Sequence, residues 1–153
     1  MSTEILEIKH NREKFLDLLL LADPEEAVVL AYLNQGWLFA LYEDGELYGV
    51  MHLIEHDART LEIKNLAVKE SAHGKGYGMR LINQAKVFGK QQGYRTLLVG
   101  TGNSGAGIFT FYQKAGFRFK SVIRDFFVVN YKEPIFENGL QCRDMVLLDQ
   151  ELD

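Results

Sequence analysis

A short segment of the sequence, SAHGKGYGMRL at residues 71–81, places three glycines in five positions directly before an apolar, helix-like stretch. Glycine costs about 0.5–1 kcal/mol relative to alanine in regular structure, so three of them indicate a need for bare backbone. The first N–H groups of a helix are unpaired and carry a partial positive charge, which suits an anion. Gly74, Gly76 and Gly78 would let phosphate oxygens approach those donors, and Lys75 adds a positive charge. The pattern therefore favours phosphate binding.

Other phosphate motifs fit less well. A P-loop needs the pattern GxxxxGK[ST], which the sequence does not contain. The segment GTGNSG, with Gly100, Gly102 and Gly105, does match the dinucleotide pattern GxGxxG, and Asp125 lies twenty residues beyond its last glycine. It begins two-thirds of the way along the chain, too late for a full doubly wound nucleotide fold. A tight turn that uses glycine only for its dihedral angles is a further alternative, which explains one glycine well and three poorly.

The strand expected before the glycines changes its hydrophobic phase. In LEIKNLAV the apolar residues begin at odd positions, Leu61 and Ile63, and then switch to even positions, Leu66 and Val68. A regular strand would turn one of these pairs to solvent. One extra residue around positions 64–65, a β-bulge, would restore the pattern and leave backbone N–H and C=O groups free for a ligand. Burial of the strand on both faces, without a bulge, is the alternative.

The surrounding pattern predicts the order β-α-α-β-β-β-α-β-α-β-β, an α/β fold with a mixed sheet and helices on both faces. We expect Asn11 to cap the first helix and Pro24 to occupy the first position of the second. The sequence EDGE at residues 43–46 predicts a tight hairpin. Expected strands cover residues 4–9, 37–42, 47–56, 59–68, 96–101, 117–129 and 142–149, and expected helices cover 12–22, 24–34, 77–90 and 108–115. Residues 130–141 are expected to form a loop, and residues 1–153 a single domain.

The composition argues against several classes of function. The chain has 17 basic and 21 acidic residues, a net charge of −4 and no basic stripe, so we expect no nucleic-acid partner. Cys142 is the only cysteine, and no His, Cys or Asp cluster has metal-ligand spacing, so we expect no internal disulfide and no metal. The N-terminus lacks a secretory signal and the longest apolar run is too short to span a bilayer. We therefore expect no membrane association and a cytoplasmic location.

These features together resemble the GNAT superfamily of acetyl-CoA-dependent N-acetyltransferases, and in particular its bacterial members. The family signature is Arg or Gln, two residues, Gly, one residue, then Gly or Ala. Here it corresponds to HGKGYG, with His73 in the place of Arg or Gln. The segments LEIKNLAV and FYQKAGF, and the order of elements, extend the resemblance over nearly the whole chain. The resemblance implies a GNAT-like acyl-CoA N-acyltransferase fold and acetyl-CoA as the cosubstrate.

The resemblance also implies which residues bind the cofactor. Backbone groups of Leu66, Ala67 and Val68 would hold the pantetheine arm. The pyrophosphate would be held by main-chain amides of His73, Gly74, Lys75, Gly76, Tyr77 and Gly78, together with Met79. In this family an asparagine near the start of the later helix often contacts the cofactor. Asn103 is the candidate for that role, and Ser104 is the alternative.

Two side chains are candidate catalytic residues. Glu62 corresponds to the glutamate base of some family members. A base helps because a lysine-like amine with a pKa near 10.4 is neutral in only about one molecule in 2,500 at pH 7. Tyr112 corresponds to the family's usual partner of the leaving thiolate. A solvated strand residue and a packed helix residue are the respective alternatives, and His52 and His56 could face the acceptor pocket or be ordinary core and surface residues.

The expected function is acetyl transfer to the primary amine of a small molecule or peptide, by direct attack in a ternary complex. An acyl-CoA-binding sensor module without catalysis is the alternative, and GTGNSG leaves a nicotinamide oxidoreductase as a third. The sequence does not identify the acceptor, so free amino acids, polyamines, aminoglycosides and protein N-termini stay open. Exposed late strands often pair in this family, so the resemblance also allows a homodimer.

Overall fold

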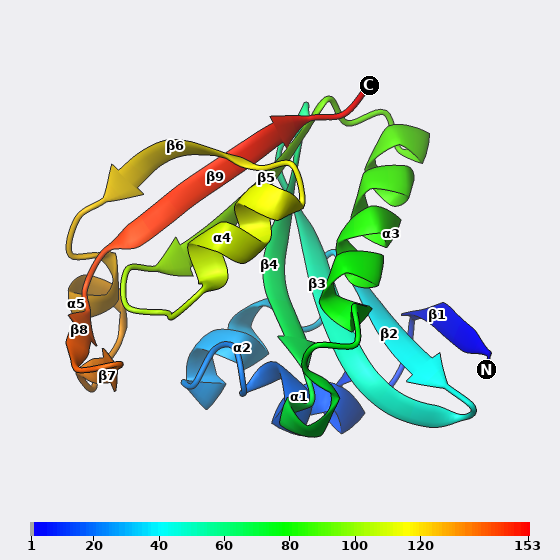
Figure 1. The fold of residues 1–153 in the computed structure, drawn as a ribbon, viewed down its shortest axis with the longest axis horizontal. Coiled ribbons are helices and arrows are strands. Elements are labelled where there is room, and N and C mark those ends of the chain that lie inside the picture. The colour runs from blue at the N-terminus through cyan, green and yellow to red at the C-terminus, as the bar shows by residue number, and fades with distance from the viewer. Residues whose placement is uncertain (1) are drawn as a thin grey trace.

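The computed structural model describes residues 2–153, and of the expected domain 1–153 only Met1 lies outside this range. Within it the main sheet has seven strands in the order β1-β2-β3-β4-β5-β9-β6, and a separate hairpin pairs β7 with β8 (Figure 1). The elements are β1 (Thr3–Ile8), a 3₁₀ turn (Arg12–Phe15), α1 (Leu16–Leu19), α2 (Glu26–Tyr32), β2 (Trp37–Glu43), β3 (Glu46–Asp57), β4 (Thr60–Val68), a second 3₁₀ turn (Glu70–Ala72), α3 (Tyr77–Gln91), β5 (Thr96–Gly102), α4 (Ile108–Lys114), β6 (Arg118–Ile123), α5 (Phe126–Asn130), β7 (Ile135–Glu137), β8 (Leu140–Cys142) and β9 (Met145–Glu151).

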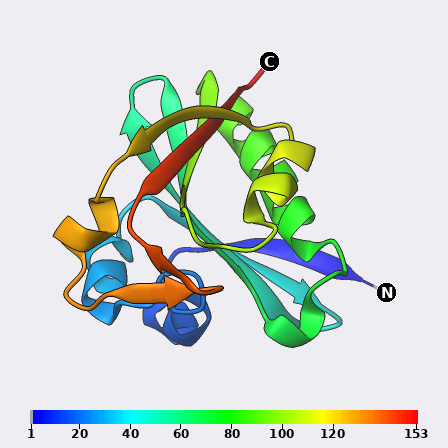
Figure 2. The same cartoon turned by 60° about the vertical axis from the view of Figure 1, so that its left-hand side comes forward.

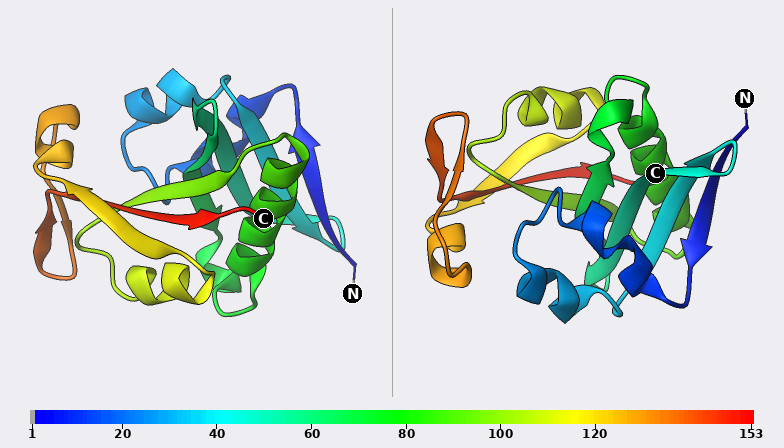
Figure 3. Two further views of the ribbon diagram at one scale, coloured as in Figure 1. Left: turned by 90° about the horizontal axis from the view of Figure 1, so that it is seen from above. Right: turned by 90° about the horizontal axis from the view of Figure 1, so that it is seen from below.

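The sheet separates two helical layers, with α3 and α4 on one face and α1 and α2 on the other (Figure 3). The larger core lies under α3 and α4, where Leu81, Ile82 and Ala85 pack fully buried against the strands. The smaller core joins Leu19 and Val29 to β2, β3 and β4. These two cores confirm the expected helices on both faces of the sheet, and the parallel pair β4–β5 among antiparallel pairs makes the sheet mixed, as expected.

Several local predictions are confirmed. The hairpin between β2 and β3 turns at Asp44 and Gly45, whose φ angles of 50° and 84° are those of a primed two-residue turn. The helix expected over residues 77–90 is α3, which ends one residue later. Gly93, with φ 87°, terminates it in the left-handed conformation.

The first helical segment is shorter and less regular than predicted, and the predicted Asn11 cap was wrong. Asn11 lies in the left-handed region with φ 56° and makes no side-chain capping bond, and only a 3₁₀ turn and the single turn of α1 follow it. Next to it, the buried guanidinium of Arg12 donates to the carbonyls of Leu33 at 2.9 Å, Gln35 at 2.7 Å and Gly36 at 3.0 Å. The chain therefore docks here through a tertiary contact. The second helix also begins later than expected, at Glu26, two residues beyond the proline.

The C-terminal region also differs from the prediction. The expected strand 117–129 is β6 only as far as Ile123, and the chain then turns at Asp125, with φ 60°, into α5. The expected loop 130–141 contains the hairpin β7–β8, and Cys142 belongs to this hairpin while the last strand begins only at Met145. In Figure 2, α5 follows the end of β6, and the hairpin precedes the start of β9. After α5, Tyr131 Oη donates to Asp23 Oδ1 at 2.8 Å.

Candidate active site between β4 and β5

A β-bulge lies in β4, as the change of hydrophobic phase predicts. His52 of β3 pairs with Asn65, and the next residue, Leu53, pairs with Ile63, so Lys64 is the extra residue. Before the bulge, Leu61 and Ile63 face α3, and after it Leu66 and Val68 do so. The extra residue thus keeps the apolar side chains on the core face of the strand.

The parallel pairing between β4 and β5 stops at this bulge. Its ladder runs from Thr60 and Thr96 to Ile63 and Val99, after which the two strands diverge, as Figure 1 shows. Leu66, Ala67 and Val68, the residues expected to hold the pantetheine arm, follow on the diverging part of β4. An extended ligand can pair with a strand edge of this kind through main-chain hydrogen bonds.

The glycine segment ends at the N-terminus of α3. Gly74 and Gly76 have φ of 84° and 83°, and a Cβ on either one would meet no atom within 4 Å, so both lie against open space. Gly78 has a different reason to be glycine, because its Cβ would lie 3.0 Å from Cζ of Phe111 on α4. Two of the three glycines thus leave room for an anion, while the third lets α3 and α4 approach closely.

The remaining side chains of this segment have structural partners. The ring of His73, which replaces the Arg or Gln of the family signature, lies with Nε2 2.9 Å from the carbonyl oxygen of Val68 and ties the loop to the end of β4. Tyr77 is buried, stacks on Tyr48 and donates its hydroxyl to Glu43, which raises the pKa of Tyr77 to about 12. The ammonium of Lys75 lies 6.0 Å from the ring centroid of Tyr48. Met79, half-buried, packs against the larger core.

Tyr112 lies on α4, next to Phe111 and therefore close to the start of α3. Its ring packs edge-on against Phe111 and Phe117 at centroid distances of 5.2 and 5.6 Å. Burial raises the pKa of the Tyr112 hydroxyl, so this group is a hydrogen-bond donor over the whole physiological range. The residue has both a packing role and a hydroxyl that no other residue of the described chain engages.

Glu62 lies on the opposite face of β4, half-buried. Its Oε1 is 3.3 Å from Nδ1 of His56, whose side chain is 51% exposed. Glu62 also lines an open pocket of about 580 Å³. Gly100 and Lys64 line the same pocket, and because each directly follows the last paired residue of its strand, the pocket adjoins the point where β4 and β5 separate.

The wall of this pocket opposite β5 contains a hydrogen-bond network around Asp23. Tyr131 Oη donates to one of its carboxylate oxygens at 2.8 Å and Tyr32 Oη to the other at 3.2 Å. Asn65, beside the bulge, donates from Nδ2 to Tyr32 Oη at 2.9 Å. The network connects α5, the α1–α2 segment and β4 around the pocket, a connection between residues too distant in the chain for sequence patterns to indicate.

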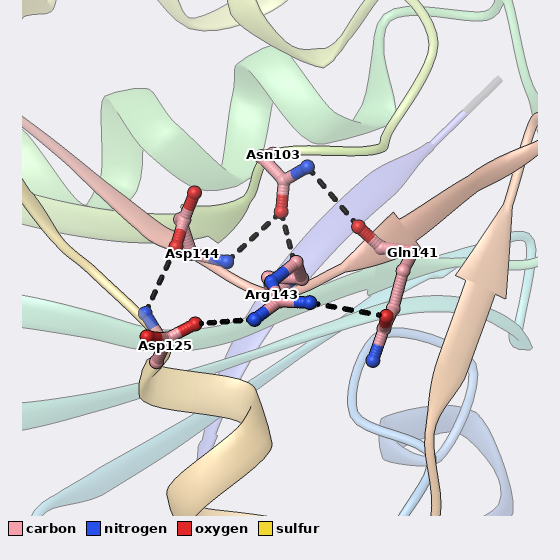
Figure 4. A network of polar contacts seen from close by, with 5 residues as sticks. All are labelled: Asn103, Asp125, Gln141, Arg143 and Asp144. Carbon is pink, nitrogen blue, oxygen red and sulfur yellow. Dashed lines mark hydrogen bonds and ion pairs between the residues drawn. The ribbon is translucent and has the colours of Figure 1, made fainter.

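His52, a candidate for the acceptor pocket, and Asn103, a candidate for cofactor binding, both have partners inside the protein. His52 is fully buried, with Nε2 2.8 Å from the carbonyl oxygen of Gln35, and is a core residue. Both polar atoms of the Asn103 side chain are engaged within the protein: Nδ2 donates to the carbonyl oxygen of Gln141, and Oδ1 accepts from the amides of Arg143 and Asp144 (Figure 4).

Ser104 is also turned toward the C-terminal hairpin, since its hydroxyl donates to Glu137 at 3.1 Å. The structure does not bring Asn103 or Ser104 to the diverging strands through any hydrogen bond of their side chains. Close packing explains two glycines of GTGNSG, because a Cβ at Gly100 would lie 2.5 Å from Sδ of Met145 and one at Gly102 would collide with the sulfur of Cys142. A dinucleotide is not needed to account for them.

Comparisons with known proteins identify the family. The acetyltransferase (GNAT) domain profile matches residues 34–119. The chain is 44% identical to the uncharacterized N-acetyltransferase YvbK of Bacillus subtilis over 144 residues, which cover 94% of this chain and 93% of that protein. The chain belongs to the GNAT acetyltransferase family. It is accordingly an acyltransferase enzyme.

Solved structures of GNAT proteins share the whole fold. An IAA acetyltransferase from Bacillus cereus superposes with a TM-score of 0.92 at 42% identity, covering 99% of this chain and 100% of that one. A GNAT family acetyltransferase from Elizabethkingia anophelis with acetyl-CoA bound gives a TM-score of 0.94 at 40% identity, covering 98% of both chains. The open glycines and the diverging strands of this chain fit a ligand that has an extended arm and a pyrophosphate.

Over residues 2–153, no group of three His, Cys, Asp or Glu side chains is placed to hold a metal ion. In the same part of the chain, no helix has the length and apolar character needed to cross a membrane.

Proposed function

We propose that this GNAT protein transfers the acetyl group of acetyl-CoA to a primary amine by direct attack in a ternary complex. The observation that carries the proposal is the end of β4–β5 pairing at Ile63 and Val99, directly beside the carboxylate of Glu62. It supports a cofactor arm on the free part of β4 and an acceptor in the pocket that Glu62 lines. Bound acetyl-CoA supplies an electrophilic thioester and a thiol leaving group.

The cofactor is held by backbone groups. Leu66, Ala67 and Val68 present main-chain groups to the pantetheine arm. The amides from His73 to Met79 at the N-terminus of α3 bind the pyrophosphate, and Gly74 and Gly76 keep its approach free of side chains. Asn103 and Ser104 retain a place in the proposal only through the Asn103 carbonyl and the Ser104 amide, because their side chains, the Asn103 amide and the Ser104 carbonyl already have partners within the protein.

Glu62 acts as the base. The acceptor arrives mainly as an ammonium ion, and Glu62 takes one proton from it, directly or through water. His56, 3.3 Å away and half-exposed, receives that proton and passes it to solvent. The neutral nitrogen then forms the new C–N bond as the C–S bond breaks, and the remaining extra proton on the nitrogen passes to the departing thiolate, directly or through water. The Tyr112 hydroxyl donates a hydrogen bond to the departing sulfur and keeps its own proton, since burial raises its pKa.

The test is acetyl-CoA-dependent thiol release across a panel of amines, combined with thermal melting. Acetyl-CoA should raise the melting temperature, because a ligand that binds only the folded state stabilises it. Glu62→Gln should lower kcat/KM by about 100-fold at pH 7. The loss should shrink toward pH 10, where solution deprotonates the amine. Glu7→Gln, an exposed change on β1, is the matched control and should behave as the parent protein.

The opposite results have clear meanings. Stabilisation by acetyl-CoA without thiol release for any amine, together with no effect of Glu62→Gln, would favour a sensor module. A protein that acetyl-CoA fails to stabilise at millimolar concentration would contradict the proposal altogether.

A further inference from the structure

We infer that the acceptor carries a second positively charged nitrogen, which Glu25 binds, so that the substrate class is an alkyl diamine or polyamine. This inference rests on the proposed function and concerns the same pocket. It depends on three features of the pocket: a carboxylate oxygen without a partner, apolar side chains between the charged groups, and a described lining that contains no arginine.

The unpartnered atom is Oε2 of Glu25, at the start of α2. This oxygen is buried and, among residues 2–153, has no hydrogen-bond partner. The side chain does not cap α2 either, although Glu25 occupies the N-cap position. Leaving a buried carboxylate oxygen without a donor is costly, and an ammonium group from a ligand would supply that donor.

Neighbouring carboxylates do not have the same need. Both oxygens of Asp23 already accept hydroxyl protons, from Tyr32 and Tyr131. Glu62 has His56 beside it and is the proposed base. Glu25 is thus the pocket carboxylate left for a ligand cation, at a position distinct from the reacting amine.

The lining between charged groups suits a hydrocarbon spacer. The pocket of about 580 Å³ exceeds the volume needed for a single small amine. Between its polar and charged groups, which include Gln35 and Asn130, the pocket is lined by apolar side chains of α2, β3, α5 and β9, namely Ala27, Val28, Ala31, Ile54, Phe126 and Met145. An alkyl chain would bury apolar surface here, with one nitrogen at Glu62 and the other at Glu25.

The positive side chains of the pocket do not favour a zwitterionic amino acid. Its cations are Lys64 and Lys132, both exposed, and the ammonium of Lys64 already lies 5.6 Å from the ring centroid of Tyr32. No arginine is among the pocket-lining residues of the described chain, and bidentate recognition of a carboxylate depends on arginine. The lining therefore favours a cation over a carboxylate as the acceptor's second group.

Three acceptors that share a five-carbon chain test this inference. Beyond the reacting amine, 1,5-diaminopentane carries an ammonium, pentylamine a methyl group and 5-aminopentanoate a carboxylate. Thiol release from acetyl-CoA gives kcat/KM for each. We expect the diamine to exceed pentylamine by about tenfold, the usual scale of one charge-assisted hydrogen bond, and 5-aminopentanoate to fall below pentylamine.

The decisive variant is Glu25→Gln, which keeps the shape of the side chain and removes its charge. It should lower the ratio of diamine to pentylamine kcat/KM by about tenfold. Glu26→Gln makes the same charge change one residue along α2, at an exposed position outside the pocket, and should keep the parental ratio. Thermal melting confirms that both variants are folded, and if Glu25→Gln is not, the comparison of the three acceptors in the parent protein decides.

Several outcomes would overturn the inference. They are equal rates for the diamine and pentylamine, a preference for 5-aminopentanoate, and a Glu25→Gln loss shared equally by both amines. Acetylation of other amines but none of these three would also overturn it, while leaving the proposed acetyltransferase activity intact. Thiol release with no amine at all would instead overturn the proposed function.

Discussion

His52 makes the stability of this protein depend on pH in a way that can be isolated. The ring is fully buried, and burial, followed by the charges of Arg12 and Lys64, lowers the pKa of His52 from 6.5 to about 4. The hydrogen bond to the carbonyl of Gln35 opposes this shift only in part. As the pH falls below 6.5, His52 becomes protonated in the unfolded chain, whereas in the folded chain it stays neutral down to about pH 4. Acid therefore favours the unfolded state.

The size of the effect follows from the shift. Each pKa unit corresponds to 1.36 kcal/mol, so the whole change from 6.5 to about 4 amounts to about 3 kcal/mol. Between pH 7.5 and pH 4.5, His52 alone should remove about 2.5 kcal/mol from the free energy of unfolding. His52→Gln retains a donor for the Gln35 carbonyl, loses ring packing at every pH, and cannot titrate.

Urea unfolding followed by the fluorescence of Trp37, the only tryptophan, measures this at several pH values. The parent protein should lose about 2.5 kcal/mol more than His52→Gln over the interval, whereas His10→Gln, which removes an exposed histidine, should follow the parent. If the curves for His52→Gln and the parent run parallel, His52 is not buried in its neutral form and the reasoning fails.

Three further results are expected. Gly76→Ala and Gly45→Ala each place a Cβ in open space at nearly the same left-handed φ. Each should therefore lower the free energy of unfolding by about 1 kcal/mol and the melting temperature by a few degrees. Calorimetry should show weaker coenzyme A binding only for Gly76→Ala. Tyr112→Phe keeps the ring packing and should lower kcat about tenfold or more with little change in melting temperature; an unchanged kcat would remove the hydroxyl from the mechanism. The edge strand β6, whose residues are all exposed, should pair two copies of the chain into a dimer. Val122→Lys, at a residue that is 54% exposed, should convert the dimer into a monomer in analytical sedimentation. A parent protein that is already monomeric would refute this.

The sequence was informative where structure depends on local periodicity. The phase change across LEIKNLAV predicted the bulge at Lys64 because the core accepts apolar side chains from only one face at each point of the strand. It failed at α5, where the run FFVV favours a strand by its β-branched and aromatic residues. The turn into α5 depends instead on Asp125, whose amide donates to Asp144 and whose carboxylate binds Arg143, both distant in sequence.

The candidate site divides in the same way. Its backbone elements, the glycines and the bulge, leave signals in single segments of sequence. The contacts between its side chains leave no such signal. Glu62 and His56 lie on neighbouring strands, and Asp23 and Tyr131 are 108 positions apart in the chain. The direction of the Asn103 side chain could not be predicted from the sequence either, because hydrogen bonds to the backbone amides of Arg143 and Asp144 determine it.

The position of the bulge explains how one strand can serve two chemical requirements. A base must be held rigidly, and Glu62 is, because it still pairs with Leu98 of β5 on one side and Ile54 of β3 on the other. A ligand arm needs an unpaired strand edge, which begins only after Ile63. A bulge before Glu62 would free the base from β5, and one placed several residues later would carry the paired edge into the region proposed for the cofactor. The extra residue at Lys64 puts a fixed carboxylate and an open edge within a few residues of each other, as attack on a thioester by a deprotonated amine requires.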